Sequence, residues 1–472
     1  MIFYRERILN IFVFLFILCL FLSKNLSAQD FQQLGSFKEG ERVLILAPHP
    51  DDEAIACAGI IQEAILKGAK VKIVYLTNGE HNEFVFIVYK KRIVFRKNEF
   101  ISLGKLRREE SIKAMQLLGL NADDLIFLGY PDFGTFSIFT RFWDTGKPYR
   151  SLLTRISSVP YVDSPSFKAP YLGENILKDL KKVISDYRPD KIFVSHPADV
   201  NVDHKSLYLF LQIALAQLKE EISYPKIYPY LVHHSGWPLP RHYHPELELN
   251  PPKSFLDSDI KWLKFNLTAE QLDNKKKAIL CYKSQTQSSA FYLLAFARKN
   301  ELFGDYPAIN LNHQANLNEK KVSFFGSLKM FPDITSEGNY AENISLASKG
   351  RVNYAVLEDG LIIMIEKPEN IVYRFSTTVY LFGYNDKVPF AEMPKIRIIT
   401  KHKNFRVLDG KRLINSNGIY LKLAPSELTI KIPLKELGSP DFILASVRSY
   451  IGRDEGGDSP IYSTGFRRIN IN

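Results

Sequence analysis

Two short segments of the sequence concentrate side chains that can bind a metal ion or move a proton. Residues 49–52 read His-Pro-Asp-Asp, and residues 196–204 read His-Pro-Ala-Asp-Val-Asn-Val-Asp-His. A catalytic zinc ion needs about three ligands from His, Asp or Glu, with one position left for water. His49, Asp52 and His204 meet that need. We therefore expect these three side chains to bind Zn²⁺.

Asp51 is left beside these ligands, and its carboxylate is the candidate general base that takes a proton from metal-activated water. An Asp-Asp pair in front of a helix can also be a simple N-cap with an acid in the first turn. The presence of two His- and Asp-rich segments, each directly after a strand, favours the metal site. A calcium loop opening at Asp199 is excluded, because an EF-hand needs Gly and Glu where His204 and Phe210 stand.

Strand-like and helix-like patterns alternate over the first part of the chain. Residues 43–47 form a continuous apolar run, as expected of a strand buried on both faces. Further strands are expected at 71–76, 125–128 and 192–194, and helices at 55–66, 106–118, 176–187 and 204–218. This order predicts an α/β fold with a mostly parallel sheet and helices on both faces. The carboxyl ends of such strands line a ligand crevice, so the two segments can converge there.

From about residue 322 onward the pattern changes to short alternating runs separated by turn signals such as Asp409-Gly410. This pattern is typical of a β-sandwich-like domain. We expect a signal peptide at residues 1–28, an α/β domain at 29–315, and a β-rich domain at 322–472 that could bind carbohydrate.

The N-terminus has the layout of a secretory signal. A short basic start precedes the apolar run 8–22, and Leu26-Ser27-Ala28 offers a cleavage site. We expect export to the periplasm or the extracellular space, with no membrane span after cleavage; an uncleaved anchor is the alternative. Cys57 and Cys281 would remain, and their pairing is left open. The net charge of +11 is spread along the chain without a recognition motif, so no nucleic-acid partner is expected.

The two segments resemble the motifs of the PIG-L / LmbE-like deacetylase family, whose signature is a strand followed by His-Pro-Asp-Asp-Glu and whose second motif ends in Asp-His. The resemblance covers about residues 41–304 and includes parts of 107–119, 130–132 and 282–285. It implies a Rossmann-like fold, a mononuclear zinc site and hydrolysis of the N-acetyl group of an N-acetylglucosamine-type sugar or glycan. The oligomeric state is not predicted.

Carried over by motif position, His49, Asp52 and His204 would be the ligands and Asp51 the base. Arg107 and Asp132 would contact substrate, although a surface ion pair is an equal alternative for Arg107.

The sequence departs from the family where relatives often place an oxyanion-stabilising His. Asn201 stands there, and an amide can donate a hydrogen bond but carries no positive charge. His196, His233 or His234 could supply an imidazole instead, or each could be a hydrogen-bonded structural residue. Asp199 and Asp203 are expected either to support the ligands or to contribute to this electrophile.

Two other functions stay open. The chain could be a non-catalytic glycan-binding protein on a degenerate deacetylase scaffold, or a zinc hydrolase of another amide or ester.

Overall fold

The computed structural model describes most of the chain after residue 30. The described residues are 31–81, 96–143, 146–256, 258–312, 325–329, 331–332, 351–357, 359–366, 375–401, 404–415, 418–424, 427–451 and 462–472. The expected signal peptide lies outside them. Within them, no helix combines the length and hydropathy that crossing a membrane requires.

The first part of the chain folds around an eight-stranded mixed sheet. Its strand order is β1-β7-β8-β6-β5-β2-β3-β4. The bounds are β1 Gln32–Gln33, β2 Arg42–Ala47, β3 Lys70–Thr77, β4 Leu125–Tyr130, β5 Lys191–Ser195, β6 Lys226–Tyr230, β7 Lys261–Asn266 and β8 Asn300–Asp305. Strands β4, β3, β2, β5 and β6 are parallel, whereas β8 is antiparallel to its neighbours. The predicted mostly parallel sheet is confirmed.

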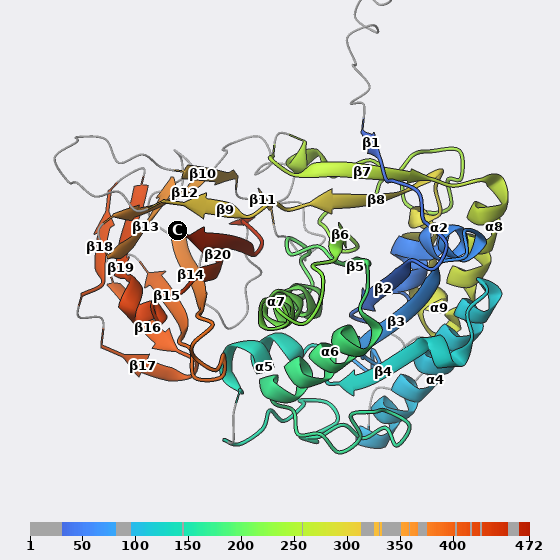
Figure 1. Cartoon of the computed structure of the whole chain (residues 1–472), viewed down its shortest axis with the longest axis horizontal. Coiled ribbons are helices and arrows are strands. Elements are labelled where there is room, and N and C mark those ends of the chain that lie inside the picture. Colours follow the sequence, from blue (N-terminus) through green and yellow to red (C-terminus); the bar gives the residue numbers. More distant parts are fainter. Residues whose placement is uncertain are drawn as a thin grey trace, which may run out of the picture.

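Helices cover both faces of this sheet (Figure 1). One face carries α2 Asp52–Leu66, α4 Lys97–Leu117, α8 Ala269–Cys281 and α9 Lys283–Leu293; the other carries α5 Thr135–Arg141, α6 Gly173–Tyr187 and α7 Val202–Gln217. Strand β2 shows why both faces are filled. Val43 and Ile45 join the core beneath α2, while Leu44 and Leu46 join the core beneath α6 and α7. An apolar run without alternation is thus buried on both sides, as expected of a central parallel strand.

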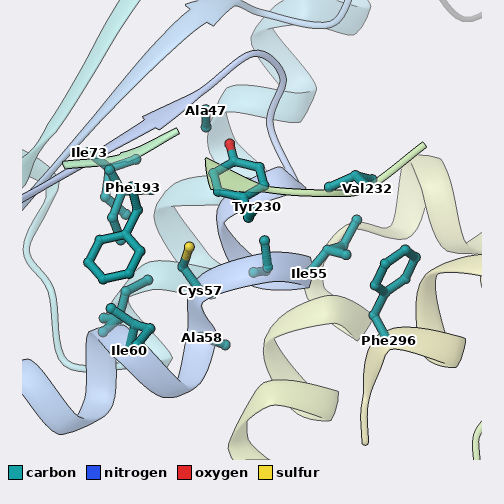
Figure 2. Packing of buried hydrophobic residues seen from close by; sticks show 14 of the residues in the cluster. Ala47, Ile55, Cys57, Ala58, Ile60, Ile73, Phe193, Tyr230, Val232 and Phe296 are labelled. Carbon is teal, nitrogen blue, oxygen red and sulfur yellow. The ribbon is translucent and has the colours of Figure 1, made fainter. Parts of the chain in front are cut away.

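The core beneath α2 packs aliphatic and aromatic side chains from several strands and helices (Figure 2). Cys57 points from α2 toward Phe193 of β5 and Tyr230 of β6, while Ile55 lies beside Val232 and Phe296. Cys57 is buried and Cys281 is half-buried, and both are free thiols, so no bridge joins them.

The C-terminal part consists of two mostly antiparallel sheets packed face to face, in which only the described pair β9 and β22 is parallel. One contains β10 Phe325–Lys329, β12 Arg351–Leu357, β13 Gly360–Glu366, β18 Tyr420–Leu423 and β19 Glu427–Pro433. The other contains β9 Ile309–Leu311, β11 Phe331–Pro332, β14 Phe375–Tyr384, β15 Lys395–Lys401, β16 Asn404–Asp409, β17 Arg412–Ile414, β20 Phe442–Ile451, β21 Tyr462–Ser463 and β22 Arg467–Ile471. Their facing aliphatic side chains form one core. The expected β-sandwich-like architecture is confirmed.

Helix α7 lies between the α/β sheet and the C-terminal strands (Figure 1). Its sequence is apolar almost all round, which is typical of a helix without a solvent face. On the same side, Phe139 of α5 contacts both Phe210 of α7 and Phe382 of β14, with ring centroids 4.9 and 5.3 Å apart. The two parts of the chain therefore share a core. Strand β9, at residues 309–311, pairs in parallel with β22, which lies much later in the sequence, at residues 467–471.

Candidate metal centre

The two His- and Asp-rich segments meet at the point where the sheet reverses its winding. From β2 the chain continues to β3 and β4 on one side, whereas β5 and β6 lie on the other. Such a switch point leaves a crevice outside the carboxyl ends of the two adjacent strands. His49 follows β2 directly, and His204 lies in the first turn of the helix after β5. The fold therefore brings distant sequence segments to one place.

Three side chains form a compact cluster in this crevice. The Oδ2 atom of Asp52 lies 3.4 Å from Nδ1 of His49 and 3.1 Å from Nε2 of His204. All three residues are buried, and their ligand atoms are close enough to share one ion. Asp52 is fixed in turn, because its Oδ2 also accepts a hydrogen bond from the backbone N–H of His49 at 2.9 Å.

The donor set fits zinc. Two imidazoles and one carboxylate are the ligand types of a catalytic zinc site. Both ring nitrogens of His204 are buried and, within the described residues, neither makes a hydrogen bond of good geometry. Such unsatisfied buried polar atoms are costly unless something else pairs with them. A cation between His49, Asp52 and His204 would satisfy one of these nitrogens.

Further carboxylates hold the opposite edges of the two imidazoles. Nε2 of His49 lies 3.1 Å from Oδ1 of Asp132 and 3.2 Å from Oδ2 of Asp203. Nδ1 of His204 lies 3.2 Å from Oδ2 of Asp199. Carboxylates behind metal-binding imidazoles fix their orientation and raise their basicity. The expected supporting role of Asp199 and Asp203 thus matches their position, and Asp132 shares it.

Asp203 and Asp199 are themselves anchored by backbone groups. Oδ2 of Asp203 accepts from the N–H of Phe133 at 2.6 Å, and its Oδ1 also contacts Thr135. Asp199 accepts from the N–H groups of Asn201 and His233, both at 2.8 Å. The loops after β4, β5 and β6 are therefore tied to the ligand set through these two carboxylates.

Asp51 stands at the N-cap of α2 in an unusual backbone conformation. Its φ of 121° is positive, which is rare outside glycine. Its side chain makes no capping hydrogen bond, so capping does not account for its carboxylate. Oδ2 of Asp51 instead faces the guanidinium of Arg107 at 3.3 Å. The side chain remains available to the crevice, which it lines.

The two adjacent carboxylates have different electrostatic surroundings. Burial raises the pKa of Asp51 to about 7, opposed by Arg107 and assisted by the neighbouring charge of Asp52. Burial also acts on Asp52, but the imidazoles of His204 and His49 outweigh it and hold the pKa of that carboxyl below its usual range. Two neighbouring acids with separated pKa values suit different roles, one as proton acceptor and one as permanent anion.

Arg107 is buried rather than part of a surface ion pair. Its terminal nitrogens donate to the carbonyls of Gly79 at 2.7 Å and Pro50 at 2.6 Å. The neighbouring Arg108 takes the more exposed place and pairs with Asp163. Arg107 thus fixes the backbone next to Asp51 while its guanidinium lines the crevice.

The crevice is a cavity of about 460 Å³. Its lining contains most of the residues expected from the sequence, together with others from the loops after β3, β4 and β6 and from α9. These additional residues are His81, Phe133, Val232, Gln285, Ser289, Tyr292 and Leu293, with Ile55 of α2. His233, one of the histidines left open as the oxyanion-binding group, also lines the cavity. His81 directly follows the loop after β3, so the end of a third strand was the signal that could have identified it.

The four candidates for the oxyanion-binding group occupy different places. Asn201 lines the cavity, and its Oδ1 accepts from the N–H of Asp203 at 2.8 Å, which leaves its amide N–H₂ to donate. His233 also lines the cavity, with its ring edge-on to His204 at 4.6 Å and its Nδ1 3.4 Å from Asp199. His196 is instead fully buried against Trp262, and His234 contacts Ser254. Neither of the last two lines the cavity.

Comparison with known proteins agrees with this geometry. The model of the family described as PIG-L: GlcNAc-PI de-N-acetylase matches residues 44–215. The chain is 28% identical over 197 residues to 1D-myo-inositol 2-acetamido-2-deoxy-alpha-D-glucopyranoside deacetylase of Mycobacterium sp. (strain KMS), covering 41% of this chain and 56% of that protein. The protein of the same description from Corynebacterium glutamicum (strain R) is 30% identical over 81 residues, covering 17% of this chain and 27% of the relative.

The chain thus spans little more than half the length of the mycobacterial relative. Among solved structures, N,N'-diacetylchitobiose deacetylase from Pyrococcus horikoshii is similar over 52% of this chain and 70% of that chain, at 20% identity and a TM-score of 0.32. The matched segment contains both strands of the switch point and all three residues of the cluster. Residues 44–215 therefore match the PIG-L family model.

Proposed function

We propose that the chain is a zinc-dependent N-deacetylase that hydrolyses the acetamide of an N-acetylglucosamine-type sugar or glycoconjugate. The observation that carries the proposal is Asp51. A buried carboxylate without a capping role lines the cavity immediately beside His49, Asp52 and His204. A scaffold that only bound sugars would have no need of this carboxylate in a strained backbone position.

His49, Asp52 and His204 would hold the metal. When bound there, zinc lowers the pKa of water and polarises a carbonyl oxygen, which is the activation that amide hydrolysis requires. Asp132 and Asp203 keep the ring of His49 in place, and Asp199 does the same for His204. These contacts fix the positions of the ligands before substrate arrives.

Asp51 accepts the proton of the attacking water, and its carboxyl can then deliver that proton to the leaving amine. Arg107 favours the charged form of Asp51, while burial opposes it, so the carboxylate is able to work in both directions near neutral pH. Asn201 donates its amide N–H toward the developing oxyanion, and the His233 ring, which contacts His204, lines the same cavity. His81, Phe133 and Tyr292 provide aromatic walls for a sugar ring.

The proposal is tested by measuring acetate release from N-acetylglucosamine and its β-1,4-linked oligosaccharides, with and without a chelator. Acetate release that the chelator abolishes and added zinc restores is the expected result. Binding of these sugars without any acetate release would favour the glycan-binding alternative. Release of other acyl groups or cleavage of esters, with N-acetyl sugars inert, would favour a different zinc hydrolase.

We also propose that the chain is exported, on the basis of the basic start, apolar run and small-residue site within residues 1–28. N-terminal sequencing of protein recovered outside the cytoplasm should begin at Gln29. A chain that retains residues 1–28 and sediments with membranes would instead support the uncleaved anchor.

A further inference from the structure

A second cavity lies away from the metal centre, between the α/β sheet and the C-terminal strands. Its volume is about 590 Å³, and it shares no lining residue with the metal-centre cavity. It forms where the sheet opens: β6 and β8 are paired only at Tyr230 and Phe303, and the earlier residues of β6 line the cavity. Helix α7 and strand β22 close the other sides.

Two polar side chains of α7 face this cavity without partners. Tyr208 and Gln212 are one helical turn apart and therefore project from the same face. They are only 5% and 4% exposed, and within the described residues neither side chain makes a hydrogen bond. Neither polar group is shut off from the cavity, so a ligand that displaces water there must itself pair with the amide and the phenol. Their position on the cavity wall points to a ligand that supplies hydroxyl groups.

The remaining walls combine aromatic faces with groups of mixed charge. Tyr224 is 61% exposed at the cavity and Tyr228 is half-buried in its lining. Asp305 offers a carboxylate, and Lys226 and Arg468 offer donors. The Arg468 guanidinium is held in place, because its Nε donates to Oδ1 of Asn470 at 2.9 Å and its Cζ lies 3.8 Å from the centroid of the Phe442 ring.

We propose that this cavity is a second, non-catalytic binding site for a neutral pyranose unit of a glycan. A pyranose has apolar C–H faces that stack on tyrosine rings and a rim of hydroxyls that both donate and accept hydrogen bonds. Gln212 and Tyr208 can do both, Asp305 accepts, and Arg468 donates. The cavity volume lies in the range of small-molecule sites and suits one or two sugar rings.

The site would hold a glycan at a fixed distance from the metal centre. Gln212 lies about 12 Å along α7 from His204, because an α-helix rises about 1.5 Å per residue. One helix thus carries a metal ligand near its start and a sugar contact further along. A glycan chain bound at the second site would raise the local concentration of its own acetylated units near the protein.

The test uses Asp51→Asn protein and two neutral disaccharide probes, cellobiose and the β-1,4 disaccharide of N-acetylglucosamine, measured by saturation-transfer NMR and calorimetry. Cellobiose has no acetyl group, so its binding does not depend on the proposed deacetylation. We expect binding of at least one probe that weakens about threefold to tenfold in Gln212→Leu and in Tyr224→Ala, the loss of one contact each. Gln217→Leu on the same helix and the exposed Tyr420→Ala serve as matched controls and should bind as before.

Tyr224→Ala alters an exposed side chain, so it remains informative if Gln212→Leu does not fold. Three outcomes would each overturn the proposal: no binding of either disaccharide at millimolar concentration, binding that Tyr224→Ala leaves unchanged, or binding of inorganic phosphate at this cavity in place of the sugars.

Discussion

Oδ2 of Asp52, in the first turn of the helix after β2, lies 3.1 Å from Nε2 of His204, in the first turn of the helix after β5. This contact joins the two halves of the sheet at its switch point. A carboxylate between two imidazoles is held as an anion, since His204 and His49 keep its pKa low. Asp52, His204 and His49 together therefore present one negative charge and two imidazole nitrogens to the same point in space.

Asp51→Asn should abolish catalysis and leave the metal site intact. Asn has the same shape but cannot accept the proton of the attacking water, so kcat for acetate release should fall by about 100-fold to 10,000-fold. Zinc content, measured by atomic emission after dialysis, should match that of the wild type because Asp51 is not in the ligand set. Wild-type acetate release in this variant would rule out Asp51 as the base.

His204→Ala should remove the metal. The loss of one of three ligands should leave substoichiometric zinc after dialysis, together with no detectable acetate release. Asp199→Asn provides the matched comparison. It keeps the ligands and weakens only the contact at Nδ1 of His204, so zinc affinity should fall by about tenfold to 100-fold, as competition with a chelator would reveal. If His204→Ala retained stoichiometric zinc, His204 would have to be removed from the ligand set.

His233→Ala should slow the reaction far more than His234→Gln. His233 lines the cavity next to His204, whereas His234 contacts Ser254 outside it. Loss of a hydrogen-bond donor at a developing oxyanion costs about 100-fold in kcat, while KM should change little. Asn201→Ala removes the amide in the same cavity. Comparing its kcat with that of His233→Ala shows how much each side chain contributes to the hydrogen bonding of the oxyanion. Equal kcat values for the two histidine variants would contradict a role for His233.

Stability should depend on pH through His196, which does not line the metal-centre cavity. Burial lowers the pKa of His196 to about 3, against an ordinary value of 6.5. Between these two pH values the unfolded chain binds a proton that the folded chain does not, so stability falls as the pH drops from 6.5 toward 3. The contribution is about 1.4 kcal/mol per pH unit.

His196→Gln removes this titration, so its free energy of unfolding, measured by urea titration at several pH values, should decline less steeply below pH 6.5. Parallel pH profiles for the variant and the wild type would show that His196 is protonated in the folded state.

The metal cluster and the strands around it could be predicted from the sequence for a local reason. A five-residue apolar run such as 43–47 is typical of a doubly buried strand, and polar residues directly after such a strand lie at the edge of the sheet. Helix α7 was predicted from the same kind of pattern, although it begins two residues earlier than expected, at Val202.

The sequence named His233 beside His196 and His234 but could not decide which of the three lines the cavity. The position of His233 depends on the bond from its backbone N–H to Asp199, which joins the loops after β6 and β5. The antiparallel strands β7 and β8 were not predicted, because their pairing depends on contacts between segments distant in sequence. Likewise, the sequence predicted a helix where α7 lies, but only the three-dimensional structure shows that the C-terminal strands cover it.

The backbone conformation at Asp51 implies a compromise between resistance to unfolding and catalytic activity. A non-glycine residue at a φ of 121° costs on the order of 1–3 kcal/mol of folding free energy, and glycine would adopt this conformation more readily. Asp51→Gly should therefore give a chain that is more resistant to unfolding and inactive as a deacetylase. At this one residue, the most durable form of the protein and the most useful form are different molecules.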